Sequence, residues 1–240
     1  MRVWATGIRR FMPASTPKVD AVLFDIDGTL VDSNYVHVDA WSRAFRDAGH
    51  EVPSWRIHRS IGMDGSKLRE ALVGSADSPL AQKAKDLHAE YYAAASETLE
   101  ILPGARELLA ELSTRDFTVV LATSAPENEL STLRDLLEVE DSVAVVTSGE
   151  DADVAKPEPD IIGVALERAG VHADNAVMVG DSVWDIESAG RAGVRAIGVL
   201  SGGISRGELL DAGAVAVFDD PADLLEHLAD SPILSGQASA

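Results

Sequence analysis

Two aspartates separated by a single residue end the first strongly apolar run of the chain. The run begins at Ala21 and reads AVLF before Asp25, and Asp27 and Gly28 follow. Because alternate side chains of an extended strand point the same way, we expect the two carboxylates to diverge little, while glycine lets the backbone turn after them. One or two carboxylates, completed by water and phosphate oxygens, are the ligands that Mg²⁺ prefers in proteins. The pair therefore predicts a divalent-cation site at the end of a strand.

Two other structures use aspartates at such positions. A calcium-binding loop of the D-x-D-x-D-G kind is excluded, because Thr29 occupies its fifth position and Val36 its twelfth, where a bidentate glutamate is required. A simple turn remains open, since Asp and Gly are common turn residues. Polar residues at later strand ends favour the metal site over the turn.

A pair of hydroxyl residues ends the next clear apolar run, residues 118–123. Ser124, Pro126 and Glu127 have the spacing of a capping box, which predicts that Ser124 begins a helix as its N-cap. Thr123 then lies at the strand end beside a helix N-terminus, an arrangement that suits a phosphate group. Both hydroxyls are therefore candidate contacts for the phosphate of a substrate.

A lysine and two further aspartates complete the set of candidate residues. Lys156 stands before Pro157 at a predicted helix start, where the helix dipole disfavours a cation and a neighbouring anion would compensate. Asp181 follows another apolar run, as Asp25 follows the first, and Asp185 lies one helical turn further on. N-capping is the alternative role for Asp181, but a buried carboxylate needs a partner, and a metal ion supplies one.

Alternating apolar runs and helical patterns must position these residues. Continuous runs rich in β-branched residues are typical of strands buried on both faces, and helical patterns such as residues 158–169 and 185–192 separate most of them. The alternation predicts an α/β fold, a Rossmann-like parallel sheet covered by helices, in which ligands bind at the carboxyl ends of the strands. The predicted strands are residues 21–26, 118–123, 143–147, 176–180, 196–200 and 214–218.

Residues 34–100 interrupt this alternation with helical periodicity alone. Predicted helices cover residues 33–48, 66–73 and 80–96, and the sheet pattern resumes after Pro103 and Gly104. We therefore expect a helical cap at residues 34–100, inserted over the active end of the sheet, and a catalytic core made of residues 19–33 and 101–230. Residues 1–18 are predicted to be a flexible leader that lacks the apolar stretch of a secretory signal, and residues 231–240 a disordered tail.

The composition of the whole chain restricts its partners. A formal net charge of −20 repels nucleic acid and anionic lipid, so we expect neither as a partner. The chain contains no cysteine, which excludes disulfides, thiolate catalysis and zinc–thiolate sites and favours a cytoplasmic setting. No apolar run is long enough to span a bilayer. The sequence leaves a monomer and a homodimer open as oligomeric states.

The joint occurrence of these motifs resembles the haloacid dehalogenase-like hydrolase superfamily, over nearly all of residues 19–228. All four family motifs are present: DIDGT from residue 25, Thr123 after an apolar strand, Lys156 before proline, and GDSVWD from residue 180. The insertion between the first two motifs is similar to the helical cap of phosphoglycolate phosphatase and of β-phosphoglucomutase-like phosphatases. The resemblance implies that Asp185, the last motif residue, supports the site through water or through other site residues.

The resemblance also implies a role for each of the other motif residues. Asp25 would be the nucleophile that attacks phosphorus and forms an aspartyl-phosphate. Asp27 would protonate the leaving alkoxide and then activate water. Thr123 and Lys156 would hold the phosphoryl oxygens. Mg²⁺ would bind Asp25, Asp181 and the main-chain carbonyl of Asp27, and would neutralise charge as the nucleophile meets a small phosphorylated metabolite.

Three other activities on this fold are less well supported by the sequence. A dehalogenase usually lacks the second aspartate, whereas Asp27 is present. A phosphonate-cleaving enzyme would need a Schiff-base lysine in the cap, and Lys67 is the one candidate near the first cap turn. A non-catalytic sugar-phosphate-binding module would be expected to lose a catalytic carboxylate, and none is lost.

A mutase is the closest alternative to a phosphatase. His37 and Trp41 lie four residues apart on one face of a predicted cap helix, and similar residues occur in β-phosphoglucomutase and in several sugar-phosphate phosphatases. The mutase also carries a lysine where this chain has Ile61. This difference favours a phosphatase, with His37, Trp41 and Arg59 as candidate substrate contacts.

Overall fold

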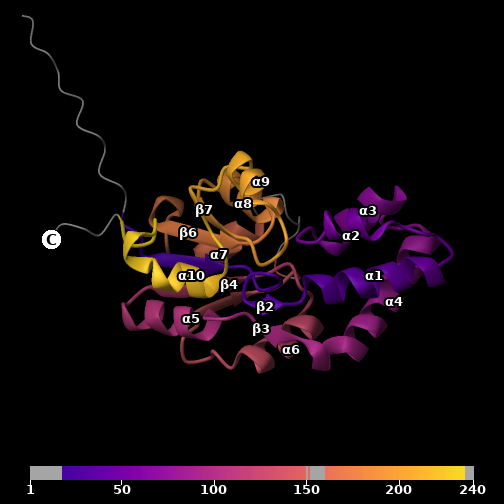
Figure 1. The fold of residues 1–240 in the computed structure, drawn as a ribbon, viewed down its shortest axis with the longest axis horizontal. Helices are drawn as coiled ribbons and strands as arrows, with labels where there is room; N and C mark the ends of the chain where they lie inside the picture. Colours follow the sequence, from indigo (N-terminus) through magenta and orange to yellow (C-terminus); the bar gives the residue numbers. More distant parts are fainter. Residues whose placement is uncertain (1–17, 150, 152–159, 236–240) are drawn as a thin grey trace, which may run out of the picture.

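A parallel six-stranded sheet forms the centre of the protein in the computed structural model, which describes residues 18–149, 151 and 160–235 (Figure 1). Its strand order is β5-β4-β1-β6-β7-β8. The predicted α/β fold is thereby confirmed, and each of the six strands of this sheet lies close to a predicted run. The strands are β1 (Ala21–Phe24), β4 (Thr118–Ala122), β5 (Val145–Thr147), β6 (Ala176–Gly180), β7 (Arg195–Val199) and β8 (Ala216–Phe218).

The alternation of side chains along the strands divides the core between the two faces of the sheet. Along β1, Val22 and Phe24 belong to one hydrophobic cluster, and Ala21 and Leu23 belong to the other. Burial on both faces explains why the strands are continuous apolar runs in the sequence. Helices α5 (Ala105–Thr114), α6 (Glu127–Leu137) and α10 (Pro221–Glu226) pack in the first cluster, and α7 (Asp160–Ala169), α8 (Val183–Arg191) and α9 (Arg206–Asp211) in the second.

A helical insertion separates the first strand from the rest of the sheet. A short antiparallel pair, β2 (Val31–Asp32) with β3 (Glu100–Ile101), lies at its base. Figure 1 shows the insertion helices grouped at one end of the molecule, beyond the sheet. Trp41, Phe45 and Ile57 belong to a third hydrophobic cluster, which holds the insertion together. The helices are α1 (Asn34–Asp47), α2 (Ser54–His58), α3 (Gly65–Val73) and α4 (Pro79–Ala95).

Three insertion helices, α1, α3 and α4, lie where the sequence predicts them. The sequence pattern does not predict α2, because five residues are too few to display a helical period. It also misses the two-residue strands β2 and β3 for the same reason. Short 3₁₀ turns complete the described part of the chain, and they are η1 (Ser96–Thr98), η2 (Ala173–Asn175) and η3 (Leu228–Asp230).

The end of the described chain differs from the prediction of a disordered tail from residue 231. Ile233 is fully buried in the first hydrophobic cluster, and the Ser231 hydroxyl donates to the Leu228 carbonyl at 2.8 Å. A single apolar side chain creates no periodic signal in a sequence, yet its burial stabilises the segment that carries it. Residues 1–17 of the predicted leader and residues 236–240 lie outside the described residues.

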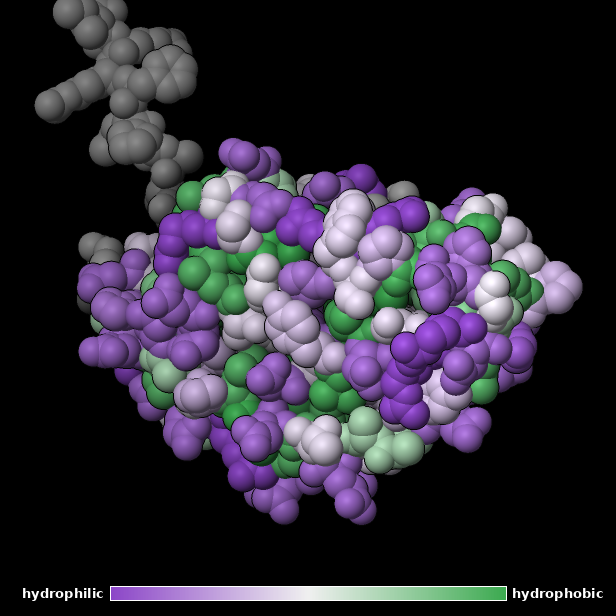
Figure 2. Space-filling view, turned by 45° about the vertical axis from the view of Figure 1, so that its right-hand side comes forward, coloured by the Kyte–Doolittle hydropathy of each residue, from purple (hydrophilic) through white to green (hydrophobic). Residues whose placement is uncertain are grey.

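The molecular surface is mixed in character. Figure 2 shows polar side chains over much of one face, with apolar residues set among them. The large exposed hydrophobic side chains include Tyr35 and Trp55 of the insertion. Within the ranges that the structure describes, no helix combines the length and the apolar character needed to cross a membrane.

Candidate active site

The parallel register of the sheet brings three of the predicted residues to one edge. Strand β1 pairs with β4 on one side and with β6 on the other. Asp25, Thr123 and Asp181 directly follow these three strands, so they emerge from neighbouring strand ends. All three side chains are buried. This is the edge at which open parallel sheets bind their ligands.

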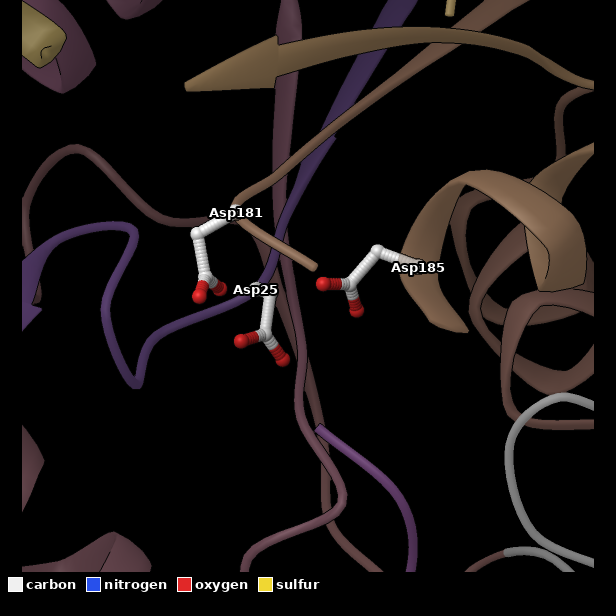
Figure 3. Close-up of side chains that lie close together, drawn as sticks. All are labelled: Asp25, Asp181 and Asp185. Atoms are coloured by element: carbon white, nitrogen blue, oxygen red, sulfur yellow. The ribbon is translucent and has the colours of Figure 1, made fainter. Parts of the chain in front are cut away.

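Three aspartates form a buried carboxylate cluster at this edge. One carboxylate oxygen each of Asp25, Asp181 and Asp185 lies within 4.8 Å of the other two. Figure 3 shows the three side chains, from two strand ends and from α8, pointing toward one shared space. Burial raises the pKa of Asp181 well above its ordinary value, and the charges of Asp185 and Asp25 raise it further. A divalent cation would remove this repulsion, and a set of hard carboxylate oxygens fits Mg²⁺.

Neighbouring polar groups hold the Asp181 carboxylate in place. The Thr29 hydroxyl donates to its Oδ1 at 3.2 Å, and the Asn34 amide donates to its Oδ2 at 2.8 Å. Two glycines make room for it, because a Cβ at Gly28 would lie 2.6 Å from the same Oδ2, and a Cβ at Gly202 would overlap the carboxylate. The sequence analysis misses the role of Asn34, whose one signal is its position at the start of the helix that follows the first motif.

Asp185 belongs both to the carboxylate cluster and to the start of α8. Its carboxylate accepts hydrogen bonds from the Ser182 N–H at 3.1 Å and from the Ser182 hydroxyl at 2.6 Å, which completes a capping box. The N-cap of α8 is therefore Ser182, and N-capping is not the role of Asp181. The sequence assigns Asp185 an indirect supporting role, whereas the structure brings its carboxylate into the cluster itself.

Asp27 faces the helical insertion rather than the carboxylate cluster. The chain does not stay extended after Asp25, because the Ile26 carbonyl accepts the main-chain N–H groups of the next turn. The Ser33 hydroxyl donates to Oδ1 of Asp27 at 2.6 Å, and Nε2 of His37 lies 3.3 Å from the same oxygen. Two side chains therefore orient this carboxylate at the wall of the pocket.

His37 connects Asp27 to a second histidine, which the sequence analysis does not single out. Nδ1 of His37 lies 3.1 Å from Nε2 of His88 on α4, and the Trp41 ring stacks on His88 with ring centroids 4.0 Å apart. Burial favours the neutral ring of His37, but the hydrogen bond and charge of Asp27 outweigh it and raise the pKa of His37. Burial lowers the pKa of His88, and the charges of His37 and Arg69 lower it further.

The segment after β4 differs from the predicted capping box. Helix α6 begins at Glu127 with Pro126 as its N-cap, and no side chain caps it. If Ser124 were the N-cap, Ala125 would be the first helical residue. Ala125 precedes Pro126, and the residue before a proline is disfavoured in the helical conformation, so the helix does not begin there. The Thr123 hydroxyl instead accepts the Ala125 N–H at 3.0 Å. Both Thr123 and Ser124 line the pocket.

One predicted substrate contact, Arg59, does not line the pocket. Arg59 forms an ion pair with Glu208 of α9, and the Trp184 indole donates to the Arg59 carbonyl at 3.3 Å. The Arg59 hydrogen bond, with those of Ser205, lowers the pKa of Glu208 to about 2. Arg59 therefore joins the insertion to the core instead of lining the pocket. Lys156 lies outside the described residues.

A cavity of about 640 Å³ lies between the sheet edge and the insertion, within the usual size range of small-molecule sites. Asp25, Asp27 and Glu129 give its core side carboxylate groups. The insertion side contributes His37 and Trp41 and also carries cationic groups. Those cationic side chains are Lys67, Arg69 and Lys85.

Comparison with known proteins gives the class that the fold and this site define. A model of the haloacid dehalogenase-like hydrolase family matches residues 19–193. The chain therefore belongs to that family, which confirms the resemblance seen in the motifs.

Individual relatives agree with this assignment. Phosphoglycolate phosphatase of Rhodospirillum rubrum is 34% identical over 220 residues, covering 87% of this chain and 90% of the relative. A phosphorylated carbohydrates phosphatase of Thermotoga maritima is 30% identical over 214 residues, covering 88% and 98%. The crystal structure of a hydrolase from Pseudomonas syringae superimposes with a TM-score of 0.83 at 34% identity, covering 88% of this chain and 98% of that one.

Proposed function

We propose that this protein is a Mg²⁺-dependent phosphatase that hydrolyses small phosphate monoesters through an aspartyl-phosphate on Asp25. The observation that carries the proposal is the buried cluster of Asp25, Asp181 and Asp185 at the edge of the sheet, with Asp27 oriented separately by two side chains. The names of the relatives, phosphoglycolate phosphatase and phosphorylated carbohydrates phosphatase, support this class of reaction.

The two aspartates after β1 divide the chemistry between them. A carboxylate oxygen of Asp25 attacks phosphorus, and the bond from phosphorus to the ester oxygen breaks as the new bond forms. Asp27, protonated at this stage, donates its proton to the departing alkoxide. The resulting Asp27 carboxylate then takes a proton from water, whose oxygen attacks phosphorus and releases Asp25 and inorganic phosphate.

Charge neutralisation is the main requirement of this reaction, because an anionic nucleophile must approach an anionic ester. Asp25 and Asp181 would hold Mg²⁺ together with the main-chain carbonyl of Asp27. When bound, the ion offsets the repulsion among the carboxylates and the phosphoryl oxygens. The Thr123 hydroxyl would donate a hydrogen bond to the phosphoryl group, and Lys156 would add a positive charge beside that group.

The substrate is proposed to be a small phosphorylated metabolite, such as a sugar phosphate or phosphoglycolate. The cavity between the sheet edge and the insertion is large enough for either. In this proposal the insertion acts as the cap that contacts the leaving group, and His37 and Trp41 are the contacts on α1. A cytoplasmic location fits the absence of cysteine from the sequence, and we propose a monomer or a homodimer as the oligomeric state.

Replacement of the proposed nucleophile tests the function directly. We expect Asp25→Asn to reduce Mg²⁺-dependent release of phosphate from a panel of phosphorylated metabolites by about a thousandfold or more, because the amide that replaces the carboxylate is a poor nucleophile. Asp39→Asn makes the same chemical change on the exposed side of α1 and should retain activity. Substantial turnover by purified Asp25→Asn would reject the mechanism.

The same panel distinguishes a phosphatase from a mutase. β-Glucose 1-phosphate with a trace of the corresponding bisphosphate should release inorganic phosphate if the proposal holds. Isomerisation to glucose 6-phosphate without release of phosphate would instead assign the protein as a β-phosphoglucomutase.

A further inference from the structure

One buried carboxylate of the pocket takes no part in the reaction as proposed. Glu129 lies in the first turn of α6, and its side chain lines the pocket near Asp27 and His37 although the residue is only 8% exposed. Across the described ranges, no side chain or main-chain group forms a hydrogen bond or ion pair with its carboxylate. Its oxygens border the pocket, where water can hydrate them, so a substrate that displaces this water must supply hydrogen-bond donors in its place.

Helix capping does not account for this burial. An acidic residue in the first turn of a helix interacts favourably with the helix dipole, but Glu127 does so from the same turn while exposed to solvent. Burial raises the pKa of Glu129, the charge of Asp27 raises it further, and the charge of His37 opposes both. Because none of the described residues supplies a donor to this carboxylate, a molecule that occupies the pocket can do so.

The position of Glu129 indicates which part of the substrate supplies that donor. In the proposed reaction Asp27 touches the oxygen of the leaving group, so the pocket beside Asp27 receives the first carbon atoms beyond the ester oxygen. The charged groups that affect the pKa of Glu129 are His37, which lowers it, and Asp27, which raises it. A hydroxyl at that place would donate to Glu129, whereas a carboxylate would face two carboxylates.

We propose that Glu129 is a specificity-determining residue that selects phosphate monoesters with a hydroxylated leaving group, such as sugar and polyol phosphates, over phosphorylated acids such as phosphoglycolate. This inference rests on the phosphatase function proposed above. The proposed specificity differs from the one in the name of the phosphoglycolate phosphatase relatives. It is closer to the one in the name of the Thermotoga maritima relative, a phosphorylated carbohydrates phosphatase.

Two esters of matched size test the inference. Phosphoglycolate and 2-hydroxyethyl phosphate differ only in the replacement of a carboxylate by a hydroxymethyl group. The wild-type enzyme with Mg²⁺ should show a kcat/KM at least about tenfold higher for 2-hydroxyethyl phosphate, because like charges in a buried site repel strongly. Glu129→Gln should bring the two values to within about threefold, mainly through a lower KM for phosphoglycolate. Glu127→Gln, which removes a carboxylate from the same helix turn, should keep the wild-type ratio.

Three results would overturn the inference: a wild-type preference for phosphoglycolate, an equal change for both esters in Glu129→Gln, or the same change in Glu127→Gln. Glu129→Ala provides a second variant if the glutamine variant fails to fold. Failure of the proposed function is distinguishable, because wild-type protein would then release phosphate from neither ester. In that case calorimetry on wild type and Glu129→Gln measures the ratio of the two dissociation constants, and a ratio that the substitution leaves unchanged would contradict the role of Glu129.

Discussion

At the scale of single residues, the aspartates of this site differ in what surrounds them. Asp181 is buried among other carboxylates, and this raises its pKa, which is consistent with the metal-binding role proposed above. Asp27 instead accepts from Ser33 and lies beside His37, in a position to touch a leaving group. The sequence alone predicts the residue types at the strand ends. It does not predict Asn34, whose contact with Asp181 depends on where the first insertion helix starts.

Removal of the Ser33 hydroxyl tests the orientation of Asp27. We expect Ser33→Ala to lower kcat by about tenfold, because a hydrogen bond to a charged group contributes roughly 1.5–3 kcal/mol. The dissociation constant for Mg²⁺ should not change, since Ser33 does not contact the carboxylate cluster. Steady-state kinetics and Mg²⁺ titration measure the two quantities. A weaker Mg²⁺ affinity with an unchanged kcat would mean that Ser33 supports the cluster and not the acid.

At the scale of elements, the sheet register and the loops after the strands build the site together. The register could be predicted from the sequence, because continuous apolar runs followed by polar residues are typical of parallel strands whose carboxyl ends meet. The conformations of the loops could not be predicted from the sequence. Pro126 shifts the start of α6 away from Ser124, and Gly202 approaches Asp181 from the loop after β7. The first effect is a local restriction of the backbone before a proline, and the second is a tertiary contact; neither leaves a periodic pattern in the sequence.

A methyl group added to the loop after β7 tests that close approach. We expect Gly202→Ala to weaken Mg²⁺ binding at least about tenfold and to lower the melting temperature, because its Cβ would overlap the Asp181 carboxylate. Gly207→Ala makes the same change in α9, where nothing lies within 4 Å of the added atom, and should retain Mg²⁺ affinity. Equal Mg²⁺ affinities for the two variants, measured by calorimetry, would contradict the role of Gly202.

At the scale of the whole molecule, an acidic protein must attract an anionic substrate. The formal net charge of −20 opposes that approach, so local groups at the site have to reverse the field. The division into a sheet and a helical insertion follows from the sequence pattern, because residues 34–100 show helical periodicity alone. The contact between the two parts could not be predicted from that pattern, because the ion pair of Arg59 with Glu208 links residues far apart in the sequence. The position of Arg59 in the sequence suggests a substrate contact, and only the fold places it at the contact between the two parts.

Chemical trapping of the phosphorylated enzyme tests the central claim most directly. Asp27→Asn should form the phosphoenzyme slowly, because it lacks the acid of the first step, but the phosphoenzyme that forms should persist, because the variant also lacks the base that activates water. Borohydride reduces an aspartyl-phosphate to homoserine, and mass spectrometry of the peptide that contains position 25 detects the change. After acid quenching during turnover with Mg²⁺, the account predicts homoserine at position 25. An unmodified Asp25 in enzyme that is releasing phosphate from its substrate, or a phosphoryl group on any other residue, would contradict the account.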